Sequence, residues 1–385
     1  MKILRIITSM NPEGGGPCQG IRNSIPALQK LGVTNEVVSF DDPGADFLKH
    51  DSFKIHAIGQ PKGPWLHQPE LIPWLLENLP HYDAAIIHGL WLYHGYAVNK
   101  AMKALSGKNI RLPKVYVMPH GMLDPYFQKA PGRKLKALRN VLYWKFIESK
   151  VINNADGVLF TCQEELLLAR QTFSPYRPKK ELNVGYGIQA PPAYTTAMDD
   201  AFKAACPQLS GSYILFLSRI HDKKGVDILI NAYIALNKDN KLPTLVIAGP
   251  GLDTPYGKEM AELAQGNTII FAGMLTGNAK WGAFYGSEAF ILPSHQENFG
   301  IAVVEAMACA KAVIISNQVN IWREIKEGNG GIVEDDTQQG ANKMLKQWLN
   351  MSNEQKIEMG LNAQKIYETK FSSEKAAVQL LNRIK

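Results

Sequence analysis

The stretch "SHQENFGIAVVEAMAC", Ser294–Cys309, decides the fold that we predict for this chain. It begins at the end of the apolar run "FILPS" (290–294), which predicts a buried strand, and it leads into "IAVVEAMACA" (301–310), which predicts a helix. The residues between them, "HQENFG", are polar and contain glycine, so they predict a loop. Glu297 then lies in the loop and Glu305 about a turn and a half into the helix, where both can face one crevice. A strand, a loop and a helix in this order form the repeating unit of a parallel α/β sheet.

Strand-like runs alternate with helical stretches along both halves of the chain. The runs are "KILRIITS", "NEVVSF", "YDAAIIHGL", "KVYVMPHG" and "DGVLFTC" in the first half, and "SYILFLSRI", "PTLVIAGPG", "NTIIFAGML", "EAFILPS" and "KAVIIS" in the second. Mostly apolar strands separated by helices favour a parallel sheet that is covered on both faces. We therefore expect the α/β class, with two Rossmann-like doubly wound domains that face each other across a cleft.

The length of the chain agrees with two domains. It has 385 residues, more than one hydrophobic core usually supports, and domains of roughly 150–200 residues are typical. The segment "NVGYGIQAPPAYTT" is rich in glycine and proline and predicts a linker near residues 185–196. We place the N-terminal domain at 1–190 and the C-terminal domain at 191–365. The last helix, within residues 366–385, is amphipathic and is expected to cross back onto the first domain.

Composition disfavours several classes of protein. With 45% hydrophobic and 20% charged residues, the chain is neither disordered nor fibrous. It has no run of about 18 uninterrupted apolar residues, so we expect no membrane-spanning helix. The apolar run at the start is too short for a signal peptide and is interrupted by Arg5. The four cysteines lack the spacing of a metal site or a disulfide framework, so a cytoplasmic location is expected.

The net charge of +7 is concentrated in one segment. Phe127–Lys150 holds seven Lys or Arg residues and one Glu, and its apolar residues recur at helical spacing: Leu135, Leu138, Val141, Leu142, Phe146 and Ile147. Two interpretations stay open. The segment is either a helix packed on the core with a solvated basic face, or a surface that sits on anionic lipid at the inner face of the plasma membrane or meets an acidic, lipid-linked acceptor. It lacks the interleaved basic and aromatic residues of a nucleic-acid motif, so we expect no nucleic-acid partner.

A glycine-rich turn follows the first predicted strand. In "EGGGPCQG" (13–20), glycines before a helix let backbone N–H groups approach a phosphate or a sugar, although a tight structural turn has the same composition. The dinucleotide fingerprint needs glycines at i, i+2 and i+5, and this spacing fails from either Gly14 or Gly15. Asp41 and Asp42 do mimic the ribose-binding acid of a dehydrogenase, so an NAD-dependent oxidoreductase remains an alternative.

Polar residues end several other strands. His120 in "VMPHGMLD" is a candidate functional residue, and His88 in "IIHGLW" has less support. Arg219 and Lys224 in "LSRIHDKKG" can converge on a diphosphate, the guanidinium as a fork and the ammonium as a point charge. Each of these residues also has a plain structural explanation as a satisfied histidine or a surface charge. The helix that begins near 299–301 offers free N–H groups to a phosphate.

Four ordered motifs resemble a known family. "ENFGIAVVE" is similar to the E-x7-E motif of glycosyltransferase family 4 (group 1), which are retaining enzymes with the GT-B fold. "FLSRIHDKKGVDILINAY", "LVIAGPG" and "PHG" resemble that family's Arg…Lys-Gly segment, its following strand and turn, and its N-domain histidine motif. The resemblance covers nearly the whole chain and is strongest over 213–325. The sequence departs from the family pattern at "GYGIQ" in the linker and at Ala310-Lys311 after the donor helix.

The resemblance implies a role for each matching residue. The N-terminal domain would bind the acceptor and the C-terminal domain the nucleotide-sugar donor. Glu297 would hold hydroxyls of the donor sugar, Glu305 would bind the ribose, and His120 would lie beside the reacting centre. Arg219 and Lys224 would stabilise the diphosphate. Further contacts to the donor would come from Gly15, Gly16, Met274, Leu275, Asn298, Phe299, Gly300 and Ile301.

Charge development suggests how such a transfer proceeds. Breaking the anomeric carbon–oxygen bond leaves a nucleoside diphosphate, and stabilising that leaving group is the main electrostatic task. Metal-dependent transferases of the other major fold use an Asp-x-Asp motif, which this sequence lacks. Arg219, Lys224 and the helix N-terminus can do the metal's work, so we predict transfer without a metal or another cofactor. Retention of the anomeric configuration is implied by the family.

The resemblance also suggests a donor and a class of acceptor. A UDP-hexose is a frequent choice in the family, so UDP-glucose is the first candidate donor, and the acceptor is expected to be a saccharide or a lipid-linked molecule. The chain also resembles bacterial transferases of exopolysaccharide or envelope-polysaccharide assembly, including those of the cyanobacterial heterocyst envelope. Two further alternatives remain: a glycoside hydrolase with Glu297 and Glu305 as its two carboxylates, and a nucleotide-sugar-binding protein without activity.

Overall fold

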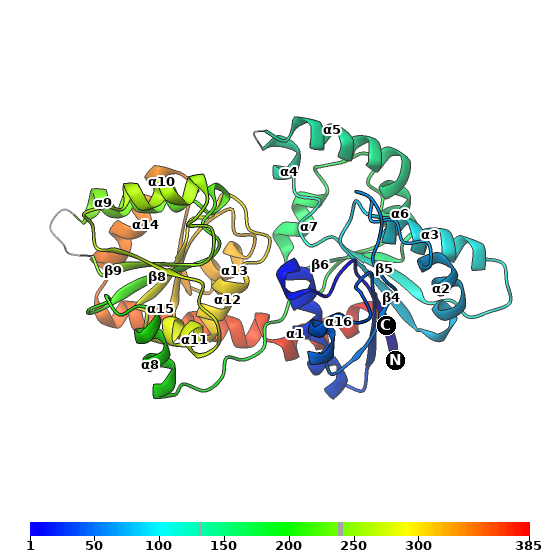
Figure 1. Cartoon of the computed structure of the whole chain (residues 1–385), viewed down its shortest axis with the longest axis horizontal. Coiled ribbons are helices and arrows are strands. Elements are labelled where there is room, and N and C mark those ends of the chain that lie inside the picture. Colours follow the sequence, from blue (N-terminus) through cyan, green and yellow to red (C-terminus); the bar gives the residue numbers. More distant parts are fainter. Residues whose placement is uncertain (131, 238–241) are drawn as a thin grey trace. The chain divides into compact units, whose positions relative to one another are not determined.

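The computed structural model describes residues 1–130, 132–237 and 242–385. The chain forms two compact units (Figure 1). Unit 1 comprises Met1–Gly187 and Ser373–Lys385, and unit 2 comprises Ile188–Ser372. Each unit contains a parallel sheet covered by helices, so the predicted α/β class with two Rossmann-like doubly wound domains is confirmed.

In the described part of unit 1, seven strands form one parallel sheet in the order β3-β2-β1-β4-β5-β6-β7. The strands are β1 (Lys2–Ile6), β2 (Thr34–Ser39), β3 (Lys54–Ala57), β4 (Ala84–His88), β5 (Lys114–Met118), β6 (Gly157–Phe160) and β7 (Glu181–Asn183). The strand order reverses between β1 and β4. In open α/β sheets, ligands bind beyond the carboxyl ends of the strands at such a switch point.

Helices bury both faces of this sheet. They are α1 (Gly16–Lys30), α2 (Leu71–Asn78), α3 (Tyr93–Leu105), α4 (Tyr126–Lys129), α5 (Lys134–Tyr143), α6 (Ser149–Asn154), α7 (Gln163–Ala169) and α16 (Ser373–Ile384). Because successive strand residues point to opposite faces, Val115 and Val117 of β5 pack with α2, α3, α6 and α7. Tyr116 and Met118 pack instead with α1 and α16.

The last helix, α16, belongs to unit 1 although it follows unit 2 in the sequence. Its buried residues Leu380, Leu381 and Ile384 share a core with α1. The Tyr116 hydroxyl donates a hydrogen bond of 3.1 Å to the carbonyl oxygen of Ile384, which ties the end of the helix to β5. Residues 366–372, which the sequence analysis grouped with this helix, lie in unit 2.

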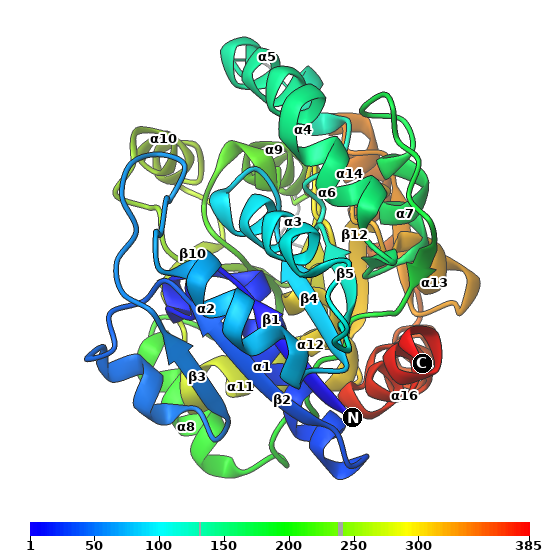
Figure 2. The ribbon, with the colours of Figure 1, turned by 90° about the vertical axis from the view of Figure 1, so that its right-hand side faces the viewer.

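The basic segment forms an exposed helical arm of unit 1. α5 continues through a π-helical turn (Trp144–Glu148) into α6, and in both views α5 stands away from the sheet (Figures 1 and 2). Five apolar residues are exposed, by 84% for Leu135 and by 49–61% for Leu138, Val141, Leu142 and Phe146. Of the two interpretations, packing of these five residues on the core is therefore wrong. Trp144, on the opposite side of the helix, is 1% exposed and anchors the arm. No helix among the described residues is long and apolar enough to cross a bilayer.

In the described part of unit 2, six strands form a second parallel sheet in the order β10-β9-β8-β11-β12-β13. The strands are β8 (Tyr213–Leu217), β9 (Thr244–Ala248), β10 (Ile269–Gly273), β11 (Ala289–Leu292), β12 (Ala312–Ser316) and β13 (Gly331–Glu334). The switch point of this sheet lies between β8 and β11.

The helices of unit 2 form two packed groups. Helices α9 (Val226–Leu236), α10 (Pro255–Leu263) and α14 (Gln338–Asn350) make up one group, and α8 (Thr196–Ala205), α11 (Gly277–Gly286), α12 (Ile301–Ala308) and α15 (Asn353–Ile366) the other. Helix α13 (Trp322–Glu327) packs on β13 and α15. Helix α12, predicted from its sequence, starts directly after the β11 loop.

Candidate active site

The candidate donor residues of unit 2 gather at the switch point of its sheet. Arg219 and Lys224 lie on the segment that connects β8 to α9, and Glu297 lies on the loop that connects β11 to α12. Since β8 and β11 are neighbours in the sheet, the two loops leave its edge side by side. This is the location at which doubly wound sheets bind their ligands.

A glycine sets the close approach of the two loops. Gly225 has a φ of 66°, and a Cβ atom at this position would lie 2.2 Å from the carbonyl oxygen of Pro293. Both the left-handed backbone and the contact exclude a side chain. Lys224, the residue before it, is 7% exposed and is thereby held against the β11 loop.

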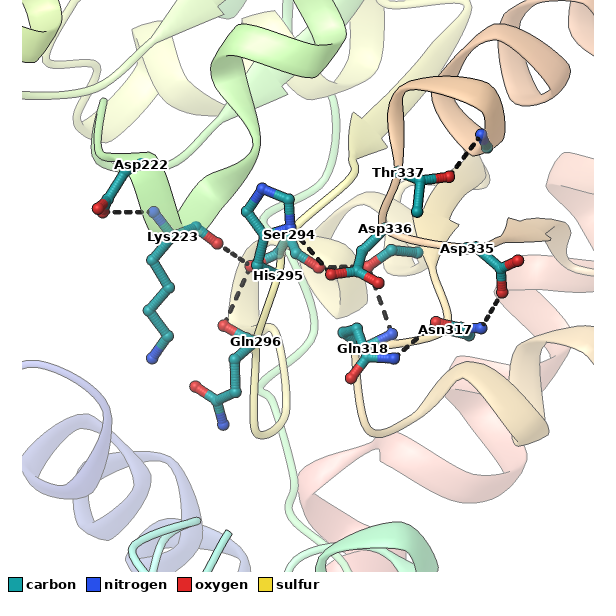
Figure 3. A network of polar contacts seen from close by, with 12 residues as sticks. Asp222, Lys223, Ser294, His295, Gln296, Asn317, Gln318, Asp335, Asp336 and Thr337 are labelled. Atoms are coloured by element: carbon teal, nitrogen blue, oxygen red, sulfur yellow. Dashed lines mark hydrogen bonds and ion pairs between the residues drawn. The ribbon is translucent and has the colours of Figure 1, made fainter. Parts of the chain in front are cut away.

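A polar network fixes the β11 loop itself (Figure 3). The backbone N–H of His295 and the Ser294 hydroxyl both donate to the carbonyl oxygen of Lys223, at 2.8 and 3.0 Å. His295 Nδ1 lies 2.9 Å from Asp336, and this contact raises the pKa of the imidazole. The backbone N–H of Glu297 donates to the carbonyl oxygen of Gln318 at 2.9 Å. Contacts to Lys223 on one side and to Gln318 and Asp336 on the other therefore fix the conformation of the loop.

Lys224 and Glu297 form an ion pair across the switch point. Burial disfavours the charged carboxylate, but the nearby Lys224 ammonium and its hydrogen bond outweigh this effect and lower the pKa of Glu297. The side chains are 9% and 24% exposed, so the pair is largely withdrawn from solvent. Both residues were predicted from the sequence, whereas their contact with each other was not.

Helix α12 begins beside this pair. Gly300, at the N-terminal cap, has a φ of 78°, and Ile301 is the first helical residue. Asn298 accepts a hydrogen bond of 3.4 Å from Asn320, and Phe299 is buried with its ring edge-on to Phe371.

Glu305 lies in the second turn of α12 and pairs with Lys280. The Lys280 ammonium donates to its carboxylate at 2.8 Å, and the two side chains are 23% and 14% exposed. Lys280 lies on α11 and had no motif to mark it in the sequence. The two carboxylates of the E-x7-E motif are therefore each neutralised by their own lysine.

The remaining candidates of unit 2 are Arg219, after β8, and Met274 and Leu275, after β10. Arg219 is exposed and has no hydrogen-bond or ion-pair partner among the described residues, so its guanidinium is available to an anion. Met274, directly after β10, is 68% exposed, whereas Leu275 is 5% exposed and packs inward.

In unit 1, the glycine turn is exposed, and a tyrosine hydroxyl binds its backbone. Gly15 and Gly16 are both exposed, and the carbonyl oxygen of Gly16 accepts a hydrogen bond of 2.6 Å from the Tyr186 hydroxyl. Asp41 accepts hydrogen bonds from the Ser9 hydroxyl at 2.6 Å and from the backbone N–H of Met10 at 2.8 Å. Asp41 thus braces the loop after β1, which accounts for the acid that resembled a dehydrogenase motif.

His120 follows β5 with a left-handed backbone, φ 53°, which is uncommon for a residue other than glycine. Its Nε2 lies 2.9 Å from Nδ1 of His88, the last residue of β4. Its ring meets that of Tyr186 edge-on at a centroid distance of 6.3 Å. Tyr186 therefore links the glycine turn to His120, a connection that the sequence analysis missed.

The structure brings together two sets of the predicted residues. In unit 2 these are Lys224 with Glu297, beside the start of α12, and in unit 1 they are Gly16 and His120. Among residues 1–130, 132–237 and 242–385, no group of three or more His, Cys, Asp or Glu side chains is arranged to hold a metal ion.

Comparison with known families accounts for both units. The profile of "Glycosyl transferases group 1" matches residues 202–366, and that of the "Glycosyl transferase 4-like domain" matches residues 15–183. The two profiles together cover most of the chain, so the fold and the sites above define a two-domain glycosyltransferase architecture. The C-terminal part of the chain is thus similar to the group 1 glycosyltransferases, and the N-terminal part to the glycosyl transferase 4-like domain. These matches support a nucleotide-sugar-dependent transferase.

Curated relatives match over shorter stretches. The chain is 28% identical over 141 residues to an uncharacterized glycosyltransferase of Methanocaldococcus jannaschii, a match that covers 35% of this chain and 36% of the relative. It is 27% identical over 135 residues to the glycogen synthase of Mycobacterium tuberculosis, covering 34% and 32%. The chain thus spans about a third of the length of these relatives.

Solved structures match over the whole chain. HepE of Anabaena, in complex with UDP and glucose, superposes with a TM-score of 0.75 at 17% identity, covering 100% of this chain and 99% of that one. Sucrose-phosphate synthase of Thermosynechococcus elongatus gives a TM-score of 0.72 at 18% identity, covering 100% and 98%. A glycosyltransferase of Rickettsia africae gives 0.75 at 16%, covering 100% and 97%. At such identities the likeness establishes the fold, and it confirms the GT-B prediction.

Proposed function

We propose that the protein is a retaining, metal-independent glycosyltransferase that moves a hexose from a UDP-sugar to a saccharide or lipid-linked acceptor. UDP-glucose is the first candidate donor, because HepE of Anabaena, which shares the fold, was solved with UDP-glucose. The setting that we propose is the synthesis of bacterial exopolysaccharide or envelope polysaccharide. The proposal also assigns the donor to the C-terminal domain and the acceptor to the N-terminal domain.

The contact between Lys224 and Glu297 carries this proposal. The ammonium and the carboxylate lie at the switch point of unit 2, and α12 begins nearby at Ile301, where the first N–H groups have no partner within the helix. A diphosphate is a natural ligand for the ammonium and for these N–H groups, while a carboxylate is a good acceptor for sugar hydroxyls. In this assignment Glu305 binds the ribose, and main chain near Met274 and Leu275 contacts the base.

The reaction assigned to these groups conserves the configuration of the sugar. The anomeric carbon–oxygen bond to the diphosphate breaks, and the acceptor hydroxyl forms the new bond on the same face of the sugar. The hydroxyl proton passes to the departing diphosphate oxygen. Arg219, Lys224 and the start of α12 stabilise the charge that develops on this leaving group, which is the largest electrostatic demand of the step.

The glycoside hydrolase alternative is disfavoured by the same contact. A hydrolase needs one carboxyl group that stays protonated to act as an acid. Lys224 instead lowers the pKa of Glu297, and Lys280 lies 2.8 Å from Glu305. A reducing-sugar assay with unactivated glycosides should therefore show no release.

Calorimetric titration with UDP-, GDP- and ADP-glucose, with and without a chelator, tests the donor assignment. We expect UDP-glucose to bind most tightly, with the same affinity in the presence of EDTA. Lys224→Ala should weaken UDP itself by roughly 10-fold or more, because it removes a charge-assisted contact. Glu297→Ala should lower turnover and sugar discrimination without weakening UDP binding. Two variants that behave like the wild type, or binding that EDTA abolishes, would refute the assignment.

We further propose that the exposed face of α5 docks on an anionic bilayer at the inner face of the plasma membrane. The apolar stripe of this face consists of Leu135, Leu138, Val141 and Leu142, and Phe146 extends it into the π-helical turn. Exposed basic residues flank the stripe along the helix: Lys134, Lys136, Arg139 and Lys145. An apolar stripe between rows of cations is complementary to acyl chains beneath anionic headgroups, and such a position would bring a lipid-linked acceptor near the enzyme.

Flotation with vesicles tests this surface. We expect the wild type to float with vesicles that contain phosphatidylglycerol and not with pure phosphatidylcholine, and we expect salt to weaken binding. Leu135→Glu combined with Leu142→Glu should abolish flotation. Ile357→Glu, at an apolar residue of α15 that is 65% exposed, is the matched control and should float normally. Concentration-dependent dimers that the double variant disrupts, without any flotation of the wild type, would point to a second copy of the chain as the occupant instead.

A further inference from the structure

Three basic residues, two of them buried and one half-buried, form a row of close contacts across the switch point of unit 1. Arg5 lies on β1, His88 ends β4, and His120 follows β5. The Arg5 Nη1 atom lies 3.4 Å from His88 Nε2, and His88 Nδ1 lies 2.9 Å from His120 Nε2. Arg5 and His88 are 2% and 4% exposed and point to the face of the sheet that α1 and α16 cover. This row of contacts allows only one arrangement of the protons on the two imidazole rings.

The direction of each hydrogen bond follows from the chemistry of arginine. A guanidinium has only donors, so His88 Nε2 must accept from Arg5 and carry no proton. Neutral His88 then carries its proton on Nδ1 and donates it to His120 Nε2. His120 Nε2 is in turn an acceptor, and the proton of the neutral ring is on Nδ1. Each step is determined by the one before it.

The surroundings keep both histidines neutral. Burial, together with the positive charge of Arg5, lowers the pKa of His120 to about 3 and that of His88 well below its ordinary value. Burial lowers the pKa of Arg5 to about 10, which still leaves the guanidinium charged at neutral pH.

Neighbouring groups hold Arg5 and His88 in place. Arg5 Nε donates to the side-chain oxygen of Asn35 at 3.1 Å, which fixes the guanidinium plane. His94 Nε2 lies 3.0 Å from the carbonyl oxygen of His88, and since a carbonyl can only accept, His94 donates there. A small, partly open cavity of about 30 Å³ adjoins Arg5, His88, His120 and Tyr186, so there is free space beside the His120 ring.

We propose that Arg5 and His88 are positioning residues that hold His120 in the tautomer with its proton on Nδ1. Nδ1 is the ring nitrogen of His120 that has no partner among the described residues, and the half-buried side chain leaves it accessible. His120 therefore offers a hydrogen-bond donor to a bound sugar or phosphate oxygen and does not act as a base through this nitrogen. The left-handed backbone at His120 agrees with a residue whose position is functionally constrained.

The consequence for catalysis rests on the proposed function. Tyr186 contacts the ring of His120 and binds the carbonyl oxygen of Gly16, so the donor nitrogen and the glycine turn belong to one rigid assembly. A sugar transferred at this site would meet a neutral N–H group. The tautomer itself depends on unit 1 alone.

Nitrogen-15 spectroscopy of histidine-labelled full-length protein measures the tautomer directly. Long-range proton–nitrogen correlations distinguish protonated from bare ring nitrogens. In the wild type at pH 7 we expect His120 to be protonated on Nδ1 and bare on Nε2, and His88 to show the same pattern. A wild-type spectrum with the His120 proton on Nε2, or with a doubly protonated His120, would overturn the proposal.

Matched variants separate positioning from folding. His88→Gln keeps the polarity, because its amide oxygen accepts from Arg5 while its amide nitrogen donates to His120. We expect this variant to retain the Nδ1–H form of His120. His88→Phe removes both groups, so His120 should populate both tautomers. Arg5→Lys should preserve the tautomer of His88, and Arg5→Met should release it. Identical His120 spectra in His88→Phe and the wild type would contradict the role of His88.

Activity supplies a second and independent readout. Transfer of glucose from UDP-glucose should show a kcat that falls about 10–100-fold in His88→Phe and recovers in His88→Gln, with the KM for the donor nearly unchanged. If the spectra behave as expected but no nucleotide sugar supports turnover, the proposed function fails while the tautomer assignment stands. If turnover occurs but His88→Gln is as impaired as His88→Phe, the positioning role fails while the function stands.

Discussion

Glu148 is a carboxyl group in the core of unit 1, at the base of the exposed arm. It is 1% exposed, one oxygen accepts a hydrogen bond of 3.2 Å from the backbone N–H of Trp91, and the other has no partner among the described residues. Burial raises its pKa to about 8. Residues such as this one oppose stability at neutral pH, because ionisation would leave a charge in an apolar surrounding.

Glu148→Gln should therefore change how stability depends on pH. The folded protein binds a proton that the unfolded chain loses near pH 4.5, so the wild type loses stability as pH rises from about 4.5 to 8. Glutamine has no proton to lose. We expect the two proteins to unfold at similar urea concentrations at pH 4.5, and the variant to be more stable by roughly 2–4 kcal/mol at pH 8.5. Parallel urea curves with the same offset at both pH values would contradict the shifted pKa.

Gly225 provides a second test at the residue scale. Gly225→Ala would place a methyl group 2.2 Å from the carbonyl oxygen of Pro293, so the loop that carries Lys224 must move. We expect a loss of roughly 2–4 kcal/mol in stability and a loss of UDP binding. Gly266→Ala is the matched control, because Gly266 has a similar φ of 75° with nothing within 4 Å. It should cost only about 1 kcal/mol, the effect of backbone strain alone, and should bind UDP normally. Equal losses in both variants would mean that the close approach to Pro293 is unimportant.

At the scale of elements, the interior strands were predictable, and so was the edge strand β10, whereas the other edge strands were not. β8 and β11 are continuous apolar runs, and β1 and β4 are mainly apolar with buried Arg5 and His88 among their residues, because both faces of a parallel sheet are buried. β3, β7 and β13 are short edge strands with mixed composition, and they form only because a neighbouring strand is already in place. The arm around α5 was ambiguous for a different reason: periodicity identifies an apolar face but does not say what covers it.

Helix α16 is an element whose contribution can be measured in isolation. Leu381 is 6% exposed and packs in the core beneath α1, whereas Val378 on the same helix is 44% exposed. Leu381→Ala should destabilise unit 1 by about 2–4 kcal/mol through the loss of buried surface and the cavity that remains. Val378→Ala should have an effect within about 0.5 kcal/mol. Hydrogen exchange of the β5 amides measures the difference. Similar exchange in both variants would show that the helix does not contribute to the stability of this unit.

At the scale of the whole molecule, strand-end residues were the informative part of the sequence. Arg219, Lys224 and Glu297 could be found because parallel strands end at one edge of a sheet, which brings distant segments together. The pairing of Lys224 with Glu297 could not be predicted, because it depends on the left-handed turn at Gly225. Arg5 did carry a signal, since a charge in an otherwise apolar strand needs a partner, but nothing in the sequence connects it to His88. Lys280 carried no signal at all.

A ligand should affect the two units unequally. We expect UDP at about 100-fold its Kd to raise the unfolding midpoint of unit 2 by roughly 5–10 °C. Hydrogen exchange should slow in the loops after β8 and β11, and uridine, which lacks the diphosphate, should have little effect. Protection confined to the glycine turn of unit 1 would place the nucleotide elsewhere and contradict the assignment.

The ion pair of Lys224 with Glu297 has a consequence for how a substrate is told from a product. While the site is empty, each residue satisfies the other. Given the proposed roles, a diphosphate that binds Lys224 leaves the Glu297 carboxylate without its partner. Only the hydroxyls of an attached sugar replace the lost interaction. The intact donor satisfies both groups, whereas the spent nucleotide satisfies one and is opposed by the tendency of the pair to close again. Tight binding of the diphosphate thus requires that a sugar is still attached to it. When the sugar has been transferred, the re-forming Lys224–Glu297 pair favours release of the nucleoside diphosphate.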